Sequence, residues 1–376
     1  MKHVVYVGFQ SPSPERGAGR IVIFRHLDRL LNSGVRVTVA STSGLSHLRC
    51  SHINIPRRRW WWPPYRTSWN FLVRLRSFLC ARDIVNSLSA VPSVVLTIID
   101  GPHAIIAKDV AKLTKSKLIC LVHDNPAVWG DFHGGRKFAD HWSQQVVAAS
   151  SACLAVTKDL LAYFDTPKET IKKILLPIPA EPLGLSIPSH VFERNPEFYI
   201  VGSLYGLESL LFKIFAEIQK LGGNLTIVCS PSQNINEMKV LVKNIEGVEV
   251  IPAFPKPDDC LRFLSARATA VIVPYASPRK GVNNFLKESF PSRLAEFSQV
   301  GLPIFIIAPA DYAVTRWGIC NGWRALVDPD SDEDWKLLRD CLDDEKWMSL
   351  ASQSACFYEL QFHPDRIHAE FVECLL

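Results

Sequence analysis

Short apolar runs alternate with amphipathic segments along the whole chain. In the first half, these runs predict strands at residues 3–9, 36–41, 94–99, 117–123, 153–157 and 173–176. Apolar residues at helical spacing predict helices between them, at residues 20–33, 102–113, 136–150 and 158–164. Strands that alternate with helices in this way are typical of parallel α/β sheets.

The pattern starts again after a proline-rich interval. Residues 177–196 contain five prolines, as expected for a linker. Beyond it we predict strands at residues 198–203, 225–230, 248–252, 270–274, 303–308 and 325–327, helices at residues 207–221, 234–243, 258–266 and 291–300, and a helical tail. The fold class is therefore α/β, with two doubly wound, Rossmann-like parallel-sheet domains at residues 1–185 and 196–345 and a tail at residues 346–376.

Composition narrows the class of protein. The 376 residues exceed one typical core, and 48% hydrophobic with 21% charged residues is ordinary for a globular protein. Ten cysteines without Cys-x-x-Cys spacing predict reduced thiols, and no leader peptide or bilayer-spanning run is recognised, so we expect a cytoplasmic protein. The net charge of +5 is mild and the basic patch is short, which disfavours nucleic acid as a partner.

The most informative segment is Glu288-Ser-Phe-Pro-Ser-Arg-Leu-Ala-Glu296, which reads as a loop that enters a helix. Pro291 suits a first helical turn, and Ser292 with the unpaired backbone N–H groups beside it forms a seat for phosphate oxygens. Glu296 lies about one and a half turns into this helix, where its carboxylate can accept hydrogen bonds from a diol. An anion seat beside a diol acceptor is what binding a sugar nucleotide requires.

The longer phrase Phe290-Pro-Ser-Arg-Leu-Ala-Glu-Phe-Ser-Gln-Val-Gly-Leu-Pro303 resembles the donor-binding segment of the family 4 glycosyltransferases (glycosyl transferases group 1). The resemblance implies the GT-B fold, with two domains facing across a cleft and the tail packed back on the first. It also implies that Glu288 contacts a sugar hydroxyl, that Glu296 holds the ribose, and that the amides of Ser289 and Phe290 meet the hexose and phosphates. The alternative is an ordinary helix with Glu296 on a solvated face.

A glycine-containing loop follows the first strand. Gly17 and Gly19 would let backbone N–H groups approach a phosphate or a sugar closely. Val22 stands where the dinucleotide pattern Gly-x-Gly-x-x-Gly needs its third glycine. The resemblance makes this the family's glycine loop, which faces donor and acceptor, and the alternative is a flexible connection.

His123 ends a predicted strand. The resemblance places it near the transferred sugar, whereas a strand-end histidine without that resemblance more often caps the strand. Gly202 ends the first strand of the second domain and permits backbone approach, as the corresponding glycine of the family does.

The chain departs from the family just after Gly202. The family has an arginine and then a lysine there, whereas this chain has Ser203 and Glu208. A departing diphosphate needs positive charge, and the available substitutes are Arg293, Arg279 and Lys280.

The acidic run Asp328-Pro-Asp-Ser-Asp332 could suggest a metal site. It follows a strand and precedes a helix, where Asp and Ser are favoured caps, so capping is the better interpretation. No metal and no cofactor are therefore predicted, and the nucleotide sugar is a substrate.

Arginines and tryptophans cluster in Arg57-Arg-Arg-Trp-Trp-Trp-Pro-Pro-Tyr65, which leads into an amphipathic helix over residues 69–82. Such a pairing suits the headgroup region of an anionic membrane, so residues 57–82 are a candidate for peripheral contact at its inner face. A core helix with an aromatic loop that binds the acceptor is the alternative.

Together these features predict a hexosyltransferase-like glycosyltransferase that acts on a carbohydrate or lipid-linked acceptor, in surface polysaccharide or glycolipid synthesis. By resemblance the reaction retains the anomeric configuration, with His123, Glu288 and Arg293 as its catalytic residues. The alternatives are a degenerate GT-B protein that binds without transfer, and a dinucleotide-dependent enzyme.

Overall fold

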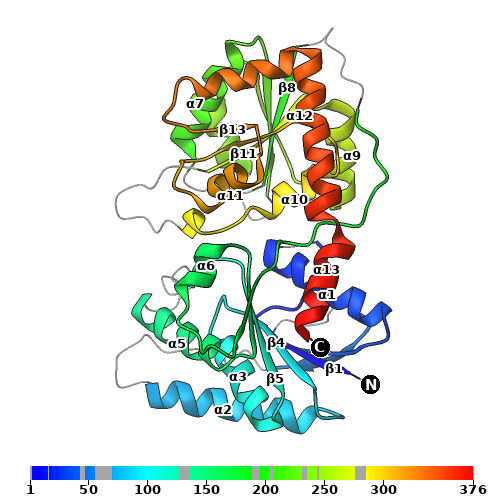
Figure 1. Ribbon diagram of the computed structural model, residues 1–376, viewed down its shortest axis with the longest axis vertical. Helices are drawn as coiled ribbons and strands as arrows, with labels where there is room; N and C mark the ends of the chain where they lie inside the picture. The colour runs from blue at the N-terminus through cyan, green and yellow to red at the C-terminus, as the bar shows by residue number, and fades with distance from the viewer. Residues whose placement is uncertain are drawn as a thin grey trace. The chain divides into compact units, whose positions relative to one another are not determined.

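The computed structural model describes residues 2–15, 17–42, 47–55, 70–126, 136–188, 195–202, 207–230, 235–243, 245–275 and 285–375. The chain divides into two compact units (Figure 1). Unit 1 comprises Met1–Leu176, Asn283–Phe290 and Ile367–Leu376, and unit 2 comprises Pro177–Val282 and Pro291–Arg366.

The described part of unit 1 contains a parallel sheet of seven strands in the order β3-β2-β1-β4-β5-β6-β7. The strands are β1 (His3–Val7), β2 (Arg36–Ser41), β3 (Ser51–Asn54), β4 (Val94–Ile98), β5 (Lys117–Val122), β6 (Ala152–Ala155) and β7 (Ile171–Ile174). Every residue of β1, β4 and β6 is buried. These strands read as unbroken apolar runs because helices cover both faces of the sheet.

The described helices of this unit are α1 (Ala18–Asn32), α2 (Asn70–Ser87), α3 (His103–Thr114), α5 (Arg136–Ala148), α6 (Lys158–Tyr163) and most of α13 (Pro364–Leu375). Helix α3 packs on β1, β4 and β5, while α2 and α5 pack against α3. Helices α1 and α13 lie side by side (Figure 1), where the ring centroids of His26 and Phe371 are 4.2 Å apart.

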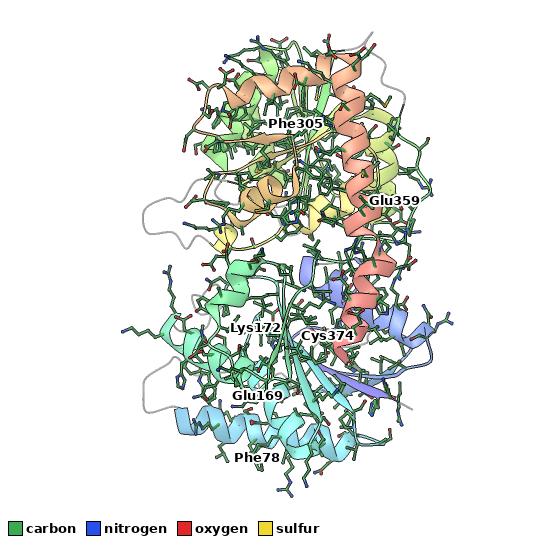
Figure 2. The ribbon with its side chains drawn as sticks, viewed as in Figure 1. Phe78, Glu169, Lys172, Phe305, Glu359 and Cys374 are labelled. Atoms are coloured by element: carbon green, nitrogen blue, oxygen red, sulfur yellow. The ribbon has the colours of Figure 1, made fainter. Side chains whose placement is uncertain are left out.

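The described part of unit 2 contains a parallel sheet of six strands in the order β10-β9-β8-β11-β12-β13. The strands are β8 (Glu197–Gly202), β9 (Asn224–Cys229), β10 (Val248–Ile251), β11 (Ala270–Pro274), β12 (Ile304–Ile307) and β13 (Leu326–Val327). The helices are α7 (Glu208–Gln219), α8 (Ile235–Val242), α9 (Pro257–Arg267), α10 (Ser292–Ser298), α11 (Ala313–Asn321) and α12 (Asp344–Phe357). The short helical turns are η3 (Phe285–Lys287, in unit 1), η4 (Asp334–Leu342) and η5 (Tyr358–Phe362). Phe305 lies fully buried in the centre of this unit (Figure 2).

The predicted fold class, α/β with two doubly wound parallel sheets, is confirmed, and each predicted strand is present with ends shifted by at most two residues. Four elements of the described part of the chain were not predicted, namely β3, η3, α11 and η4. The predicted helical tail is two helices, because the π-turn η5 and Pro364 interrupt it. Among the described residues, no helix is long and apolar enough to cross a membrane.

The strand orders locate the binding edges of both sheets. The order of strands reverses between β1 and β4 in unit 1, and between β8 and β11 in unit 2. In open parallel sheets, ligands bind beyond the carboxyl ends of the strands at such switch points. The candidate residues are therefore described at these edges, one unit at a time.

Candidate functional site

In unit 2, Gly202 ends β8 at the switch point. Its φ of +110° lies in a region that residues with a side chain rarely adopt. A Cβ at this position would lie 3.2 Å from Nη1 and 3.3 Å from Cδ of Arg293. The absent side chain thus makes room for the arginine to cross the end of the strand.

Arg293 reaches this edge from α10. Its Nη1 donates a hydrogen bond of 2.6 Å to the carbonyl oxygen of Val201. Burial lowers the pKa of Arg293, although the neighbouring Tyr275 opposes this, and an arginine remains charged under all ordinary conditions. No carboxylate among the described residues forms an ion pair with it, so a half-buried cation lies at the switch point.

Helix α10 turns one apolar face inward and one polar face outward. Leu294, Ala295, Phe297 and Ser298 are buried, whereas Ser292, Arg293 and Glu296 are half-buried. Arg293 and Glu296 are three residues apart and so lie on the same side of the helix. Pro291 precedes the first helical residue in an extended conformation, with φ −73° and ψ 112°.

Glu296 is held by the segment that follows Leu176. Its Oε2 accepts a hydrogen bond of 3.1 Å from the backbone N–H of Ala180. Burial and the charge of Glu296 together raise the pKa of the Cys260 thiol to about 12. The carboxylate is therefore oriented by the backbone instead of standing free in bulk solvent.

In unit 1, His123 follows β5 and lies near the start of α1. Gly19 belongs to the first turn of this helix instead of to a loop, and a Cβ on it would lie 3.5 Å from Nδ1 of His123, so the helix backbone passes close to the imidazole. Burial lowers the pKa of His123 to about 4, although the charge of Asp100 opposes this shift. The ring is therefore neutral near pH 7, and it can exchange hydrogen bonds but supplies no positive charge. Gly17, with φ +73°, precedes α1 and is exposed.

Asp100 is a residue at this edge that the sequence analysis missed. It follows β4 at the switch point, and its Oδ1 lies 3.1 Å from Nε2 of His103. Burial and the charge of Asp100 raise the pKa of Tyr6, and the charge of Arg20 lowers it in part. The signal available in the sequence was an acidic residue directly after a buried strand.

Glu288 belongs to unit 1 and lies against the ends of β5 and β6. Its backbone carbonyl accepts a hydrogen bond of 2.6 Å from Oγ1 of Thr157, and its Oε2 accepts a hydrogen bond from Nδ2 of Asn125. The sequence analysis also missed the side-chain amide of Asn125 and the hydroxyl of Thr157, because neither residue lies in a motif. Ser289 and Phe290, which follow Glu288, are buried.

The boundary between the units falls between Phe290 and Pro291, so the two glutamates of the motif belong to different units. The structure brings together His123 with Gly19, and Gly202 with Arg293. Ser203, Arg279 and Lys280 lie outside the described residues, as does the tryptophan-rich segment at residues 57–65.

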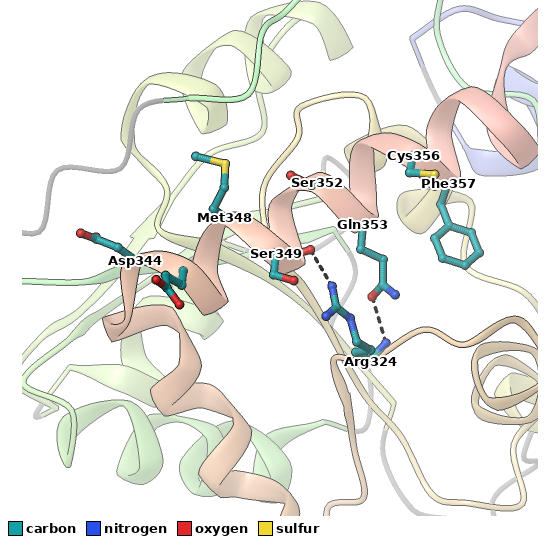
Figure 3. Close-up of a pocket in the computed structure, with 9 residues that line it drawn as sticks. Arg324, Asp344, Met348, Ser349, Ser352, Gln353, Cys356 and Phe357 are labelled. Atoms are coloured by element: carbon teal, nitrogen blue, oxygen red, sulfur yellow. Dashed lines mark hydrogen bonds between the residues drawn. The ribbon is translucent and has the colours of Figure 1, made fainter.

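Two further features of unit 2 have local explanations. A cavity of about 840 Å³ lies along α12 (Figure 3). Arg324 in its wall donates a hydrogen bond of 2.7 Å to the carbonyl oxygen of Ser349. This arginine stands just before β13, at the edge of the sheet opposite to the switch point. In the acidic run, Oδ1 of Asp328 accepts from the N–H of Asp330 at 2.9 Å. Ser331 Oγ accepts from the N–H of Asp334, the first residue of η4, at 3.2 Å, although the N-cap residue of η4 is Glu333 and makes no side-chain capping hydrogen bond.

No protein-family profile and no curated protein matches the chain. Solved structures do match it. One described as trehalose-6-phosphate synthase, OtsA, has a TM-score of 0.70 at 11% identity and covers 100% of this chain and 99% of its own. AviGT4, a glycosyltransferase involved in avilamycin A biosynthesis, has a TM-score of 0.57 at 13% identity, covering 100% of this chain and 97% of its own.

A third structure is described as "Trehalose-6-phosphate from E. coli bound with UDP-2-fluoro glucose". It has a TM-score of 0.66 at 11% identity and covers 100% of this chain and 99% of its own. At these identities the likeness concerns the fold, and it confirms the GT-B fold class. Membership of family 4 stays a prediction.

Proposed function

We propose that this protein is a glycosyltransferase that moves a sugar from a nucleoside diphosphate to an acceptor hydroxyl. The observation that carries the proposal is the arrangement at the end of β8, where Arg293 crosses Gly202 and shares a helix face with Glu296. It offers a cation at a switch point and a carboxylate on the same side of the adjoining helix, which are the groups that a diphosphate and a ribose need. The GT-B fold, which a protein bound with UDP-2-fluoro glucose shares, supports this assignment.

In unit 2, the diphosphate is assigned to the edge formed by Gly202, Pro291 and Ser292. Negative charge develops on the diphosphate as the glycosidic bond breaks, and a preorganised guanidinium stabilises it without reorganising at that moment. Arg293 takes this role, and Ser203, Arg279 and Lys280 are proposed to contribute. Glu296 accepts hydrogen bonds from the ribose hydroxyls, since Ala180 already fixes its orientation.

In unit 1, Glu288 is assigned to a hydroxyl of the transferred sugar, because Asn125 and Thr157 fix its side chain and backbone. The amides of Ser289 and Phe290 are proposed to face the hexose and phosphates, and the backbone at Gly17 and Gly19 the donor and acceptor. His123 serves as a neutral hydrogen-bonding partner. No carboxylic acid has to protonate the leaving group, because a nucleoside diphosphate is already a good one.

Several finer assignments belong to this proposal. Transfer retains the anomeric configuration. It needs no metal, because Arg293 supplies the positive charge at the diphosphate. The acceptor is a carbohydrate or is lipid-linked, as in surface polysaccharide or glycolipid synthesis. The protein works in the cytoplasm, in peripheral contact with an anionic membrane.

Calorimetry with uridine, guanosine, adenosine and thymidine diphosphates tests the donor site, followed by transfer assays with the matching sugars in the presence of a chelator. We expect one nucleotide to bind, Arg293→Gln to weaken it at least tenfold, and Arg262→Gln, on the exposed face of α9, to leave it unchanged. Equal binding by wild type and Arg293→Gln, or no binding of any nucleotide, would overturn the proposal.

A degenerate GT-B protein is the second candidate, favoured by Ser203 and Glu208 in place of the family's basic pair. Binding of a nucleotide sugar without hydrolysis or transfer across many donors would support it. A thermal shift that responds to NAD alone would point to a dinucleotide-dependent enzyme instead.

A further inference from the structure

Unit 1 contains a second cavity, of about 790 Å³, at the edge of the sheet opposite to the switch point. Ser116 and Leu118 at the start of β5, and Ser151 just before β6, form its floor. Helices α2, α3 and α5 form its walls. None of the residues assigned to the donor or acceptor lines this cavity, so the proposed transfer reaction does not explain it.

The cavity is rich in positive charge. Arg74, Lys108, Lys112 and Lys115 line it, and Asp109 is the only carboxylate among its described lining residues. Asp109 already accepts a hydrogen bond of 2.6 Å from Ser77. Burial lowers the pKa of Lys108, Asp109 opposes this, and the charges of Arg74 and Lys112 lower it further. Lys108 is half-buried, whereas Arg74, Lys112 and Lys115 are exposed, and like charges gathered at one place favour the binding of an anion.

Trp142 holds two of these cations in place. The Nζ of Lys108 lies 5.4 Å and the Cζ of Arg74 lies 5.6 Å from the centroid of its ring. These are cation–π distances, and the ring itself is only 1% exposed. The indole N–H of Trp142 has no hydrogen-bond acceptor within the described part of the chain. The arrangement therefore places two cations beside one buried ring.

The outer side of α2 beside this ring carries three large apolar side chains among charged ones. Leu75 is 41%, Phe78 45% and Leu79 46% exposed, and Phe78 points outward from the helix (Figure 2). Phe78 also lines the cavity. The opposite face of α2 already fills its packing role, since Val73, Ser77, Cys80, Ala81 and Ile84 are buried there. The exposed side chains are therefore available to a partner other than the core of unit 1.

Exposed arginines flank this apolar stripe. Arg76 and Arg82 lie on α2 with Arg74. Apolar and charged side chains are mixed on the exposed side of α2, where Asp83 is also exposed, and large apolar side chains next to several cations suit the headgroup layer of an anionic bilayer. Each such cation contributes about 1 kcal/mol of attraction near an anionic leaflet. A soluble anion would find the cations but would leave the apolar stripe uncovered, which favours a lipid.

We propose that this face of unit 1 docks on an anionic phospholipid surface, with a lipid phosphate in the cavity between Arg74, Lys108 and Lys112 and with Leu75, Phe78 and Leu79 in the interfacial layer. The proposal names a site for the membrane contact, and it does not depend on the chemistry of the transfer reaction. It also explains why the cations and the apolar side chains share one helix.

The test is sedimentation of the full chain with vesicles of phosphatidylcholine, alone or mixed with phosphatidylglycerol. The variants are Lys108→Gln/Lys112→Gln, which removes charge, and Phe78→Ser/Leu79→Ser, which removes exposed apolar surface. Lys239→Gln/Val240→Ser on α8 is the matched control, because it removes an exposed cation and an exposed apolar side chain from unit 2. Inorganic phosphate and glycerol phosphate form the soluble arm.

We expect retention only by the anionic vesicles, at least tenfold weaker partitioning for both test variants, and no change for the control. Raising the salt should weaken the binding, because exposed charges are screened. Equal retention by both vesicle types, or binding of the soluble phosphates at micromolar concentration without retention by vesicles, would overturn the proposal. Calorimetry with nucleoside diphosphates should be the same in all variants, so failure here and failure of the donor site remain distinguishable.

Discussion

The donor site depends on a glycine that makes room for an arginine, and Gly202→Ala tests this directly. An alanine would have to adopt φ +110°, outside the regions that L-residues favour, which costs about 1–3 kcal/mol. Its Cβ would also lie 3.2 Å from Nη1 of Arg293, closer than such contacts normally are. The guanidinium must then move by a few tenths of an ångström, which strains its 2.6 Å hydrogen bond to Val201.

The magnitude follows from these two effects. Hydrogen bonds to charged groups contribute about 1.5–3 kcal/mol, so a partial loss added to the backbone strain amounts to about 2–4 kcal/mol. We expect the variant to melt several degrees lower and to bind the nucleoside diphosphate at least tenfold more weakly, since about 1.4 kcal/mol of lost binding energy is a factor of ten. Differential scanning calorimetry and titration calorimetry measure the two quantities separately.

Gly222→Ala is the matched control for this experiment. Gly222 also has a positive φ, of +68°, but a Cβ there would meet no atom within 4 Å. The control should therefore lose stability through backbone strain alone and bind the nucleotide as wild type does. If Gly202→Ala and Gly222→Ala bind it equally well, Arg293 is not the group that holds the diphosphate, and the reasoning fails.

Three further predictions follow from the described contacts. Asn125→Ala/Thr157→Val should lower the transfer rate about tenfold with unchanged binding of the nucleoside diphosphate, since Glu288 loses two net hydrogen bonds of about 0.5–1.5 kcal/mol each; single-turnover assays check this. Glu296→Gln should reduce the preference for ribonucleotides over 2′-deoxynucleotides at least tenfold. If calorimetry gives the variant the same preference as the wild type, the assignment of Glu296 to the ribose is contradicted. His123 should titrate near pH 4 by NMR. Because the unfolded chain binds this proton at a higher pH, near 6.5, His123 destabilises the fold as the pH falls from 6.5 towards 4, and melting temperatures of wild type and His123→Gln should converge above pH 7.

Apolar runs predicted most of the fold because buried parallel strands have a simple signature. The strand β4 consists of Val94-Val-Leu-Thr-Ile98, and such a run between turn residues is hard to mistake. The strand β3 was missed because it lies at the edge of its sheet. Its residues Ser51-His-Ile-Asn54 are half-buried or exposed and include a single aliphatic side chain, so no apolar pattern marks them.

The tail shows a different limit. Buried residues recur at helical spacing from Trp347 to Phe371, which predicts one long helix. Backbone geometry breaks it at the π-turn η5 and at Pro364, where the missing N–H ends the hydrogen-bond ladder. The side-chain pattern survives this break because both helices bury one face, so the pattern alone does not reveal where the helix ends.

The site illustrates what a local motif contains and what it lacks. The phrase from Glu288 to Glu296 indicated the chemistry, but its two carboxylates are held by residues that no short motif reaches. Asn125 is 163 positions from Glu288, and Ala180 is 116 positions from Glu296. The arginine between them shows the same, since Val201 is 92 positions from Arg293. The family's basic residue follows the glycine at the end of the strand, whereas here the nearest described cation arrives at the same glycine from α10. A positive charge at a sheet edge is thus a property of three-dimensional position, and Ser203 after Gly202 does not by itself argue against a diphosphate.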